Sequence, residues 1–431
     1  MASDADPVVI LGGGLTGIST ALHLGARTPW VLFEREERLG GHARTDTRDG
    51  FCFDKTGHWL HLRDRYTKQL VHELLPDALV PVERRARVFS HGALTRYPFQ
   101  ANLHGLPPSV IKECLLGFLE RPQNLEARDF EEYCLKHFGV GISKHFMIPY
   151  NRKLWGVEPR EITSAWCDRF VPRPTLEQVV AGAVGASPPE MGYNISFLYP
   201  KQGGIETLTR ALVARLDGGR VHTRAAPDRI DPEARTITVG GETLAWRALV
   251  TSIPLPELFR VMSPLPPEVE RAAGLLRCTP VQYLNVATKR TPPVDFHWIY
   301  VPEEKYPFYR VGVYTNAVPA MAPPGRGGLY VELAARNVAR VEDVLADVAA
   351  GLCATGVLAG PDDILFAELR TIRWAYVVFD HNYYDATATC FRYLSEKQIY
   401  PRGRYGSWTY NAMEDCILAG RAVADEVVAA K

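Results

Sequence analysis

The chain has 431 residues, of which 46% are hydrophobic and 23% are charged. These are the proportions of an ordinary globular protein, and the length suggests two or three domains. Because 49 basic residues balance 49 acidic ones, the molecule as a whole gives no electrostatic reason to expect a nucleic acid or an anionic membrane as its partner.

The eight cysteines are scattered along the chain, and none stands in a Cys-x-x-Cys pair. Neither a structural zinc site nor a disulfide framework is therefore expected. No apolar run approaches the ~18 residues that are needed to cross a bilayer, and the first residues lack the pattern of a signal peptide. We expect a cytoplasmic protein with free thiols, without a bound metal and without membrane insertion.

A glycine loop follows the first apolar run of the chain. Residues 8–11 predict a buried parallel strand, and residues 18–24 after the loop read as a helix. The loop has the pattern Gly-x-Gly-x-x-Gly, in which the glycines permit the turn, the approach of a pyrophosphate and the packing of helix on strand. The pattern predicts a dinucleotide at the helix N-terminus. The expected cofactor contacts are Gly12, Gly14, Leu15, Thr16 and Gly17.

The residues after the loop narrow the choice of cofactor. A second apolar run, 30–33, ends at Glu34, where a carboxylate accepts the ribose hydroxyls of a bound dinucleotide. A glycine pair then follows, and the whole stretch resembles the extended FAD signature of glutathione-reductase-like flavoproteins, which include amine oxidases. The alternative is a glycine-rich turn followed by a surface acid. The further cofactor contacts that the resemblance implies are Arg35, Gly40, Gly41 and His42.

Later segments are expected to return to the same cofactor. Residues 220–239 read as two short strands around a turn, and 248–254 as an apolar strand that ends in a proline. Near the end of the chain, Gly403 and Arg404 precede a helix over 413–430, and Met413 begins it. This arrangement resembles the last flavin contact of the same superfamily. The FAD-binding domain is therefore expected to be discontinuous, with the substrate region inserted into it.

The inserted region is expected to hold a hairpin over 87–96 and amphipathic helices over 109–120 and 128–138. The predicted fold class is α/β, with a glutathione-reductase-like Rossmann domain, an inserted helical domain and a substrate domain built on a mixed antiparallel sheet. The expected boundaries are 1–84, 205–260 and 395–431 for the FAD domain, 100–165 for the helical domain, and 85–99, 166–204 and 261–394 for the substrate domain.

The order of motifs resembles the UDP-galactopyranose mutase family, most closely over 1–215 and 400–420. It includes Gly57-His58-Trp59, Tyr150 to Gly156, and Gly403 to Tyr410. The resemblance implies that His58 lies beside the flavin, that Tyr150 stacks on uracil and that Trp155 packs near the sugar. It also implies that the diphosphate is bound by Arg169, Arg310, Tyr376 and Tyr410. On this reading His58, Arg169 and Arg310 are catalytic. Taken one at a time, each of these side chains has a purely structural alternative, such as a surface ion pair or a core ring.

The resemblance implies a flavin-dependent interconversion of the pyranose and furanose forms of a nucleoside-diphosphate sugar, such as UDP-galactose, with N5 of reduced FAD as nucleophile. NAD(P)H is the expected reductant, in the same cleft. The alternative is an FAD-dependent oxidoreductase similar to amine oxidases or protoporphyrinogen oxidase, because residues 42–45 and 198–204 also resemble those enzymes. A third reading is a flavin-bearing binding module without catalysis.

Overall fold

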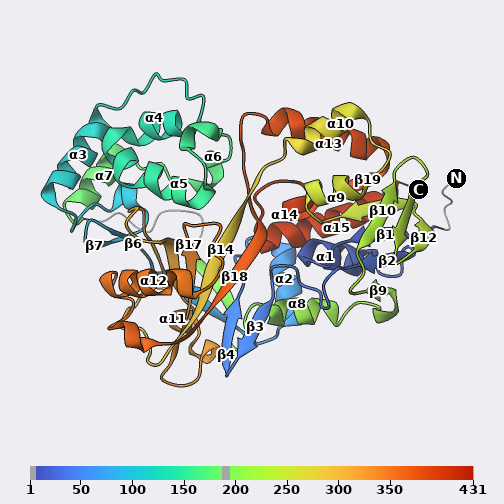
Figure 1. Ribbon diagram of the computed structural model, residues 1–431, viewed down its shortest axis with the longest axis horizontal. Coiled ribbons are helices and arrows are strands. Elements are labelled where there is room, and N and C mark those ends of the chain that lie inside the picture. Colours follow the sequence, from blue (N-terminus) through green and yellow to red (C-terminus); the bar gives the residue numbers. More distant parts are fainter. Residues whose placement is uncertain (1–5, 187–194, 431) are drawn as a thin grey trace.

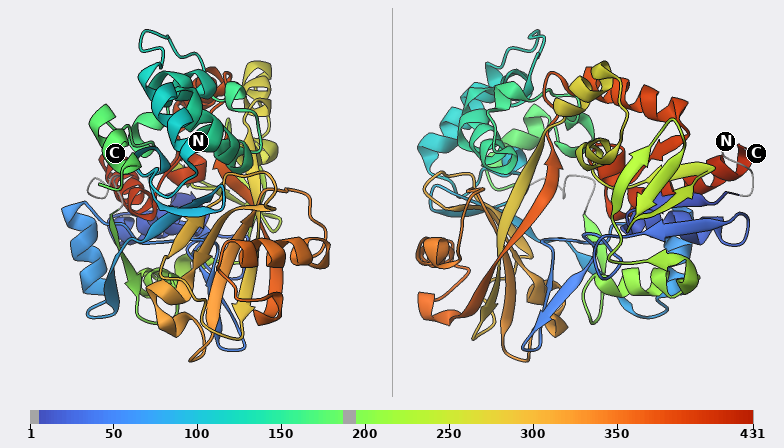
Figure 2. Two further views of the ribbon diagram at one scale, coloured as in Figure 1. Left: turned by 90° about the vertical axis from the view of Figure 1, so that its left-hand side faces the viewer. Right: turned by 45° about the vertical axis from the view of Figure 1, so that its right-hand side comes forward.

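The computed structural model describes residues 6–186 and 195–430, with the backbone alone at residues 168 and 169. Three regions are visible in Figure 1: a parallel sheet with its helices on the right, a large mixed sheet below and to the left, and a group of helices at the upper left. Figure 2 shows the same three regions from two further directions, with the long strands of the mixed sheet between the other two.

The parallel sheet has the strand order β19-β13-β1-β2-β9. Its central strand is fully buried, as the apolar run at 8–11 predicts, because helices α1 and α15 cover one face of the sheet and apolar side chains from residues 230–262 cover the other. The strands predicted at 8–11, 30–33 and 248–254 are confirmed. The bounds are β1 (Val8–Leu11), β2 (Trp30–Phe33), β9 (Val221–His222), β13 (Ala248–Thr251), β19 (Ile399–Pro401), α1 (Leu15–Leu24) and α15 (Met413–Ala429).

The two short strands around a turn that were predicted in 220–239 are present, and the same stretch contains a third strand, β9, which was not predicted. The two-residue strand β9 joins the parallel sheet beside β2, whereas β10 (Pro227–Asp231) and β11 (Thr236–Val239) form a hairpin. With β12 (Glu242–Ala245), this hairpin makes a separate three-stranded antiparallel sheet. A strand as short as β9 shows no periodicity in the sequence, so only its pairing with β2 identifies it.

The mixed sheet has the order β18-β14-β17-β16-β15-β6-β7, and β15 pairs with β6 in parallel while the other pairs are antiparallel. The hairpin predicted over 87–96 is confirmed, with His91 and Gly92 at positive φ in its two-residue turn. The bounds are β6 (Ala86–Ser90), β7 (Ala93–Arg96), β14 (Cys278–Thr288), β15 (Trp298–Tyr300), β16 (Phe308–Val313), β17 (Gly327–Leu333) and β18 (Ile364–Val377).

The helical layer contains both amphipathic helices that were predicted, now α3 and α4. They approach closely at Gly139, where an added Cβ would overlap the backbone of Gly117. Asp129 caps α4 by accepting the backbone N–H of Glu132 at 2.9 Å. The bounds are α3 (Pro108–Leu119), α4 (Phe130–Ile142), a π-helical turn (Ser143–Met147), α5 (Ile148–Trp155), α6 (Cys167–Phe170) and α7 (Leu176–Ala183).

The remaining elements connect these regions. The strands are β3 (Thr45–Arg48), β4 (Phe51–Asp54), β5 (Leu79–Glu83) and β8 (Ser196–Pro200). The helices are α2 (Arg65–Leu74), α8 (Glu206–Val213), α9 (Leu255–Val261), α10 (Pro267–Gly274), α11 (Tyr314–Ala317), α12 (Glu342–Ala354), α13 (Tyr383–Glu396) and α14 (Gly403–Gly406). Single 3-10 turns span Phe99–Ala101, Pro159–Glu161, Gly218–Arg220, Pro319–Met321 and Pro361–Asp363.

The combination of a Rossmann-type parallel sheet, a mixed antiparallel sheet and a helical layer agrees with the predicted α/β fold class. Within the residues that the structure describes, no helix has both the length and the apolar character that crossing a membrane requires.

Candidate active site

One long pocket of about 790 Å³ runs through the molecule where the three regions meet. It begins at the carboxyl ends of β1 and β2, where ligands bind in doubly wound sheets. It then passes Gly41 and Lys55 and ends between the mixed sheet and the helix α5, near Tyr376 and Tyr150. Its size and its elongated lining suit an extended cofactor and a second ligand side by side.

At the end of the pocket next to β1, glycine backbone without side chains forms a cradle. Gly14, at the N-cap of α1, faces Gly41, because a Cβ at Gly14 would lie 4.0 Å from the Cα of Gly41. Gly17 lies beneath this cradle, where a Cβ would overlap the carbonyl oxygen of Gly12. The two glycine stretches thus leave a channel without side chains beside a helix N-terminus, which fits a pyrophosphate.

Glu34 is held in place at the end of β2. Its Oε2 accepts the backbone N–H of Gly13 at 2.6 Å, and its Oε1 accepts that of Glu36 at 2.8 Å. Each carboxylate oxygen keeps a second lone pair, and the residue lines the pocket. The carboxylate is therefore orientated to accept hydroxyl groups of a ribose.

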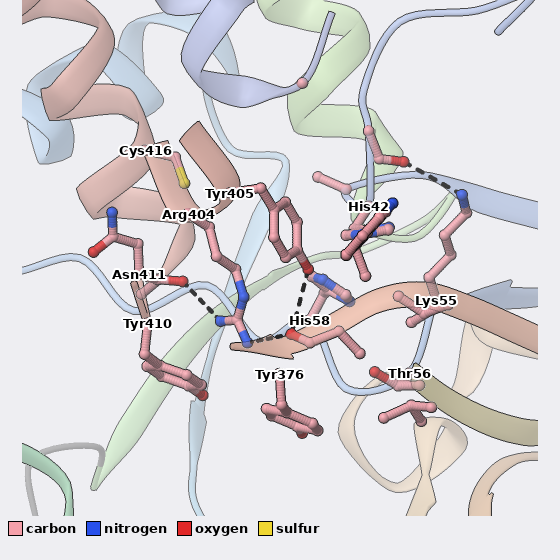
Figure 3. Close-up of a pocket in the computed structure, with 18 of the residues that line it drawn as sticks. His42, Lys55, Thr56, His58, Tyr376, Arg404, Tyr405, Tyr410, Asn411 and Cys416 are labelled. Atoms are coloured by element: carbon pink, nitrogen blue, oxygen red, sulfur yellow. Dashed lines mark hydrogen bonds between the residues drawn. The ribbon is translucent and has the colours of Figure 1, made fainter. Parts of the chain in front are cut away.

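Basic side chains gather at the middle of the pocket (Figure 3). Burial lowers the pKa of His42 well below its usual range and that of His58 to about 4, so both imidazoles are neutral at pH 7. Burial also lowers the pKa of Lys55 to about 8, and its Nζ lies 3.4 Å from the carbonyl oxygen of Gly41. The positive charge here is carried by Lys55, by the neighbouring Arg44 and by Arg404.

Arg404 lies in the centre of this group. Its Nη1 donates to the carbonyl oxygen of Asn411 at 3.1 Å and its Nη2 to that of Ala375 at 3.0 Å. The guanidinium lies 4.2 Å from the centroid of the Tyr410 ring. No carboxylate among the described residues forms an ion pair with it. A partly buried guanidinium that faces a pocket without a counter-charge favours an anionic ligand.

The far end of the pocket contains the predicted substrate residues. Tyr150, from α5, stacks on Phe146 with ring centroids 5.3 Å apart, and Trp155 packs edge-on against Tyr376 at 5.7 Å. Residues from α5, β16, β18 and the segment before α15 thus line one wall although they are far apart in the sequence. The members of the predicted set in this wall are Tyr150, Trp155, Arg310, Tyr376 and Tyr410.

Arg310 has a partner that the sequence did not reveal. Its Nη2 donates to Oε1 of Glu332 at 2.5 Å, and Glu332 is almost fully buried. Arg310 is therefore part of an ion pair in the pocket wall. Glu332 stands inside the apolar run 327–333, and an acid in a strand buried on both faces was a signal that could have marked it.

The remaining predicted residues fall into three groups. Two glycines, Gly17 and Gly403, lie behind the pocket wall and pack against neighbouring backbone or Thr16. The side chain of Arg169 lies outside the described residues. The predicted cofactor residues that line the pocket are Gly12, Gly14, Leu15, Thr16, Glu34, Arg35, Gly40, Gly41, His42, His58, Arg404 and Met413. Lys55 and Tyr405 also line it and were not predicted. Lys55 belongs to no recognisable motif, and Tyr405 lies within the motif from Gly403 to Tyr410 but had no role assigned to it.

Comparison with known proteins defines the class to which this fold and pocket belong. Residues 15–428 match the model of the flavin containing amine oxidoreductases. The chain therefore belongs to the family of flavin-containing amine oxidoreductases.

Among its relatives are sugar mutases. Over 181 residues, the chain is 26% identical to dTDP-fucopyranose mutase of Escherichia coli. This match covers 38% of this chain and 45% of that protein. Over 200 residues, it is 23% identical to a probable UDP-galactopyranose mutase of Klebsiella pneumoniae. This match covers 43% of this chain and 50% of that protein. These matches span about half the length of each relative.

The structural likeness extends over the whole chain. The crystal structure of a reduced UDP-galactopyranose mutase superposes with a TM-score of 0.93 and 25% identity, covering 100% of this chain and 95% of the other. A putative protoporphyrinogen oxidase from Exiguobacterium superposes with a TM-score of 0.76 and 16% identity, over 100% of both chains. At this identity the likeness is one of fold alone. The predicted fold class and the resemblance to UDP-galactopyranose mutases are confirmed.

Proposed function

We propose that this protein binds FAD and interconverts the pyranose and furanose forms of a nucleoside-diphosphate sugar such as UDP-galactose. The proposal draws support from the likeness to sugar mutases over the whole chain and from the chemistry of the pocket. The single observation that carries it is Arg404, a partly buried guanidinium that lines the pocket without a carboxylate partner among the described residues, beside Tyr376 and Tyr410.

FAD fits the part of the pocket that lies next to β1 and β2. The bare backbone at Gly14 and Gly41 accommodates a pyrophosphate, and Glu34 can accept ribose hydroxyls. Reduced FAD, when bound, would supply a nucleophilic N5 for attack on the anomeric carbon of the sugar. In this proposal, neutral His58 packs beside the flavin without adding charge, and Lys55 contributes positive charge near it.

The other residues act on the substrate. Arg404 binds and stabilises the negative charge of the departing diphosphate, with hydroxyl groups from Tyr376 and Tyr410. Tyr150 and Trp155 offer flat apolar faces to the base and the sugar, and their burial excludes water from the reacting bond. We propose NAD(P)H as the reductant, bound in the same cleft, and the cytoplasm as the location.

An amine oxidase is the alternative that the family membership suggests. Its substrate would carry an ammonium group, which has to lose its proton beside the flavin. The positive charges of Lys55 and Arg404 oppose the entry of such a cation, and Glu332 is already paired with Arg310. The pocket therefore favours an anionic ligand over a cationic one.

The decisive experiment compares the two oxidation states of the purified flavoprotein. The protein is reduced with dithionite under anaerobic conditions and incubated with UDP-galactofuranose, and the products are separated by anion-exchange chromatography. We expect UDP-galactopyranose from the reduced protein and no conversion by the oxidised protein. Peroxide formation from an amine or a porphyrinogen by the oxidised protein, without any sugar conversion in the reduced state, would contradict the proposal.

A further inference from the structure

Glu257 joins two regions of the fold at the end of the pocket next to β2. It lies in α9, and its carboxylate is largely buried. One oxygen, Oε2, accepts a hydrogen bond from Nη1 of Arg35 at 2.7 Å. The other, Oε1, accepts the indole N–H of Trp374 at 2.7 Å. Because Arg35 follows strand β2 of the parallel sheet and Trp374 belongs to β18 of the mixed sheet, this carboxylate bridges the two sheets.

The bridge is part of the pocket wall, since Arg35, Glu257 and Trp374 all line the pocket. Arg35 directly follows Glu34, whose carboxylate is orientated to accept the ribose hydroxyls of a dinucleotide. The carbonyl oxygen of Glu34 accepts the backbone N–H of Ala225 at 2.8 Å, and Ala225 lines the pocket as well. The bridge therefore borders the part of the pocket that suits the adenosine half of FAD.

The two contacts of Glu257 are not equally strong. The side chain of Arg35 is 53% exposed, so salt screens its ion pair, and pairs of this kind contribute little on their own. The indole N–H of Trp374 donates to an oxygen of a largely buried carboxylate, and charge-assisted hydrogen bonds are stronger than neutral ones. Trp374 therefore holds the carboxylate in place, and the contact with Arg35 is the one that opens.

We propose that Glu257 closes the adenosine end of the pocket and sets how long FAD stays bound. Release of the adenosine half requires Arg35 to separate from Glu257, while Trp374 keeps the carboxylate in its place. This inference rests on the FAD binding in the proposed function and deepens it, because it assigns cofactor retention to a residue outside the proposed substrate set. Glu257 is thus a positioning residue and takes no part in the chemical step.

The test measures the rate at which FAD leaves the holoprotein, which is followed after dilution by the rising fluorescence of released flavin. The variant Glu257→Gln keeps the size of the side chain but offers one acceptor oxygen to two donors. We expect it to release FAD roughly 10-fold faster than the wild-type protein, the usual effect of losing a charged hydrogen bond. The matched control is Glu37→Gln, whose carboxylate pairs with Arg224 at 3.3 Å on the exposed surface. The control should release FAD at the wild-type rate.

Trp374→Phe approaches the same bridge from its other side, because it removes the indole N–H and keeps an aromatic ring. This variant should also release FAD faster than the wild-type protein. The variant that combines both changes should release FAD more slowly than the product of the two single effects, because both changes act on one hydrogen bond. If Glu257→Gln does not fold, Trp374→Phe alone carries the test.

A comparison of melting temperatures separates retention of the cofactor from a merely structural role. FAD should raise the melting temperature of flavin-stripped Glu257→Gln less than that of the wild-type protein, whereas FMN, which lacks the adenosine, should shift both equally. Three results would overturn the inference: wild-type release rates in Glu257→Gln or Trp374→Phe, independent effects of the two changes, or an equal reduction of the FAD and FMN shifts. Failure of the proposed function has a different signature, because the wild-type protein would then retain FAD in this way and convert no nucleotide sugar.

Discussion

At the scale of single residues, burial decides which side chains of the pocket are charged. The pKa values of His42 and His58 are lowered chiefly because burial disfavours the charged imidazolium. Arg404 cannot respond in this way, because a guanidinium does not deprotonate in a protein. The pocket therefore keeps a fixed positive charge at physiological pH, and its affinity for an anion should not depend on the histidines.

A histidine outside the pocket gives a pH prediction. Nδ1 of His297 accepts the backbone N–H of Arg85 at 3.0 Å, which requires that nitrogen to be unprotonated. Burial lowers the pKa of His297 from 6.5 to about 4. The unfolded chain therefore binds this proton first, and the stability that neutral His297 contributes is complete above pH 6.5 and is lost as the pH falls towards 4. The loss is at most about 3 kcal/mol.

This prediction is tested with His297→Asn, whose side-chain oxygen can still accept the Arg85 N–H. The free energy of unfolding is measured with urea between pH 4.5 and 7.5, and the wild-type protein should lose more stability over this range than the variant. His72→Asn, at an exposed position on α2, should follow the wild-type curve. Parallel curves for the wild-type protein and His297→Asn would show that the site does not titrate in this range.

At the scale of elements, the packing of α1 on β1 sets the geometry of the proposed cofactor site. A Cβ at Gly17 would overlap the carbonyl oxygen of Gly12, which is backbone and cannot move aside by changing a rotamer. Gly17→Ala should push α1 away from β1 and take its N-terminus out of reach of a pyrophosphate.

We expect Gly17→Ala to be purified with less than about a tenth of the wild-type flavin content, since losing charge-assisted contacts costs roughly 1.5–3 kcal/mol. The measurement is the ratio of flavin absorbance to protein absorbance. Gly274→Ala is the control, because a Cβ there meets nothing within 4 Å. A normal flavin content in Gly17→Ala would contradict the role of the loop.

At the scale of the whole molecule, the pocket is assembled from distant parts of the chain. The glycine loop, the Lys55 to His58 segment, β16 to β18 and the segment before α15 all line it, and Figure 1 shows these parts in different regions of the fold. A ligand that fills the pocket binds the folded state alone, because the unfolded chain does not bring these segments together.

Bound FAD should therefore raise the melting temperature. The expected stabilisation is about 2.7 kcal/mol at a free FAD concentration 100 times the dissociation constant. The flavin-stripped protein is titrated with FAD while tryptophan fluorescence is followed during heating. FMN, which lacks the adenosine for the Glu34 site, should give a smaller shift at the same concentration. Equal shifts for FMN and FAD would count against the assignment of Glu34.

The sequence by itself determined the features that depend on neighbouring residues. The strand–loop–helix at 8–24, the acid at 34, the hairpin at 87–96 and the helix after Met413 were all predicted from local patterns, because apolar periodicity and glycine geometry act within a few residues. The order of motifs also indicated the relatives that the comparisons confirmed. The division into domains and the roles of the site residues stay predictions.

The tertiary structure decided what depends on strands brought together from far apart. It placed β9 beside β2, and it set Glu332 opposite Arg310 across two strands. The sequence shows Arg310 as a charge and cannot show its partner, because pairing across a sheet depends on register rather than on distance along the chain. Arg404, in α14, makes its hydrogen bonds to backbone carbonyl groups from two distant segments, and this environment of its positive charge is likewise set by tertiary packing.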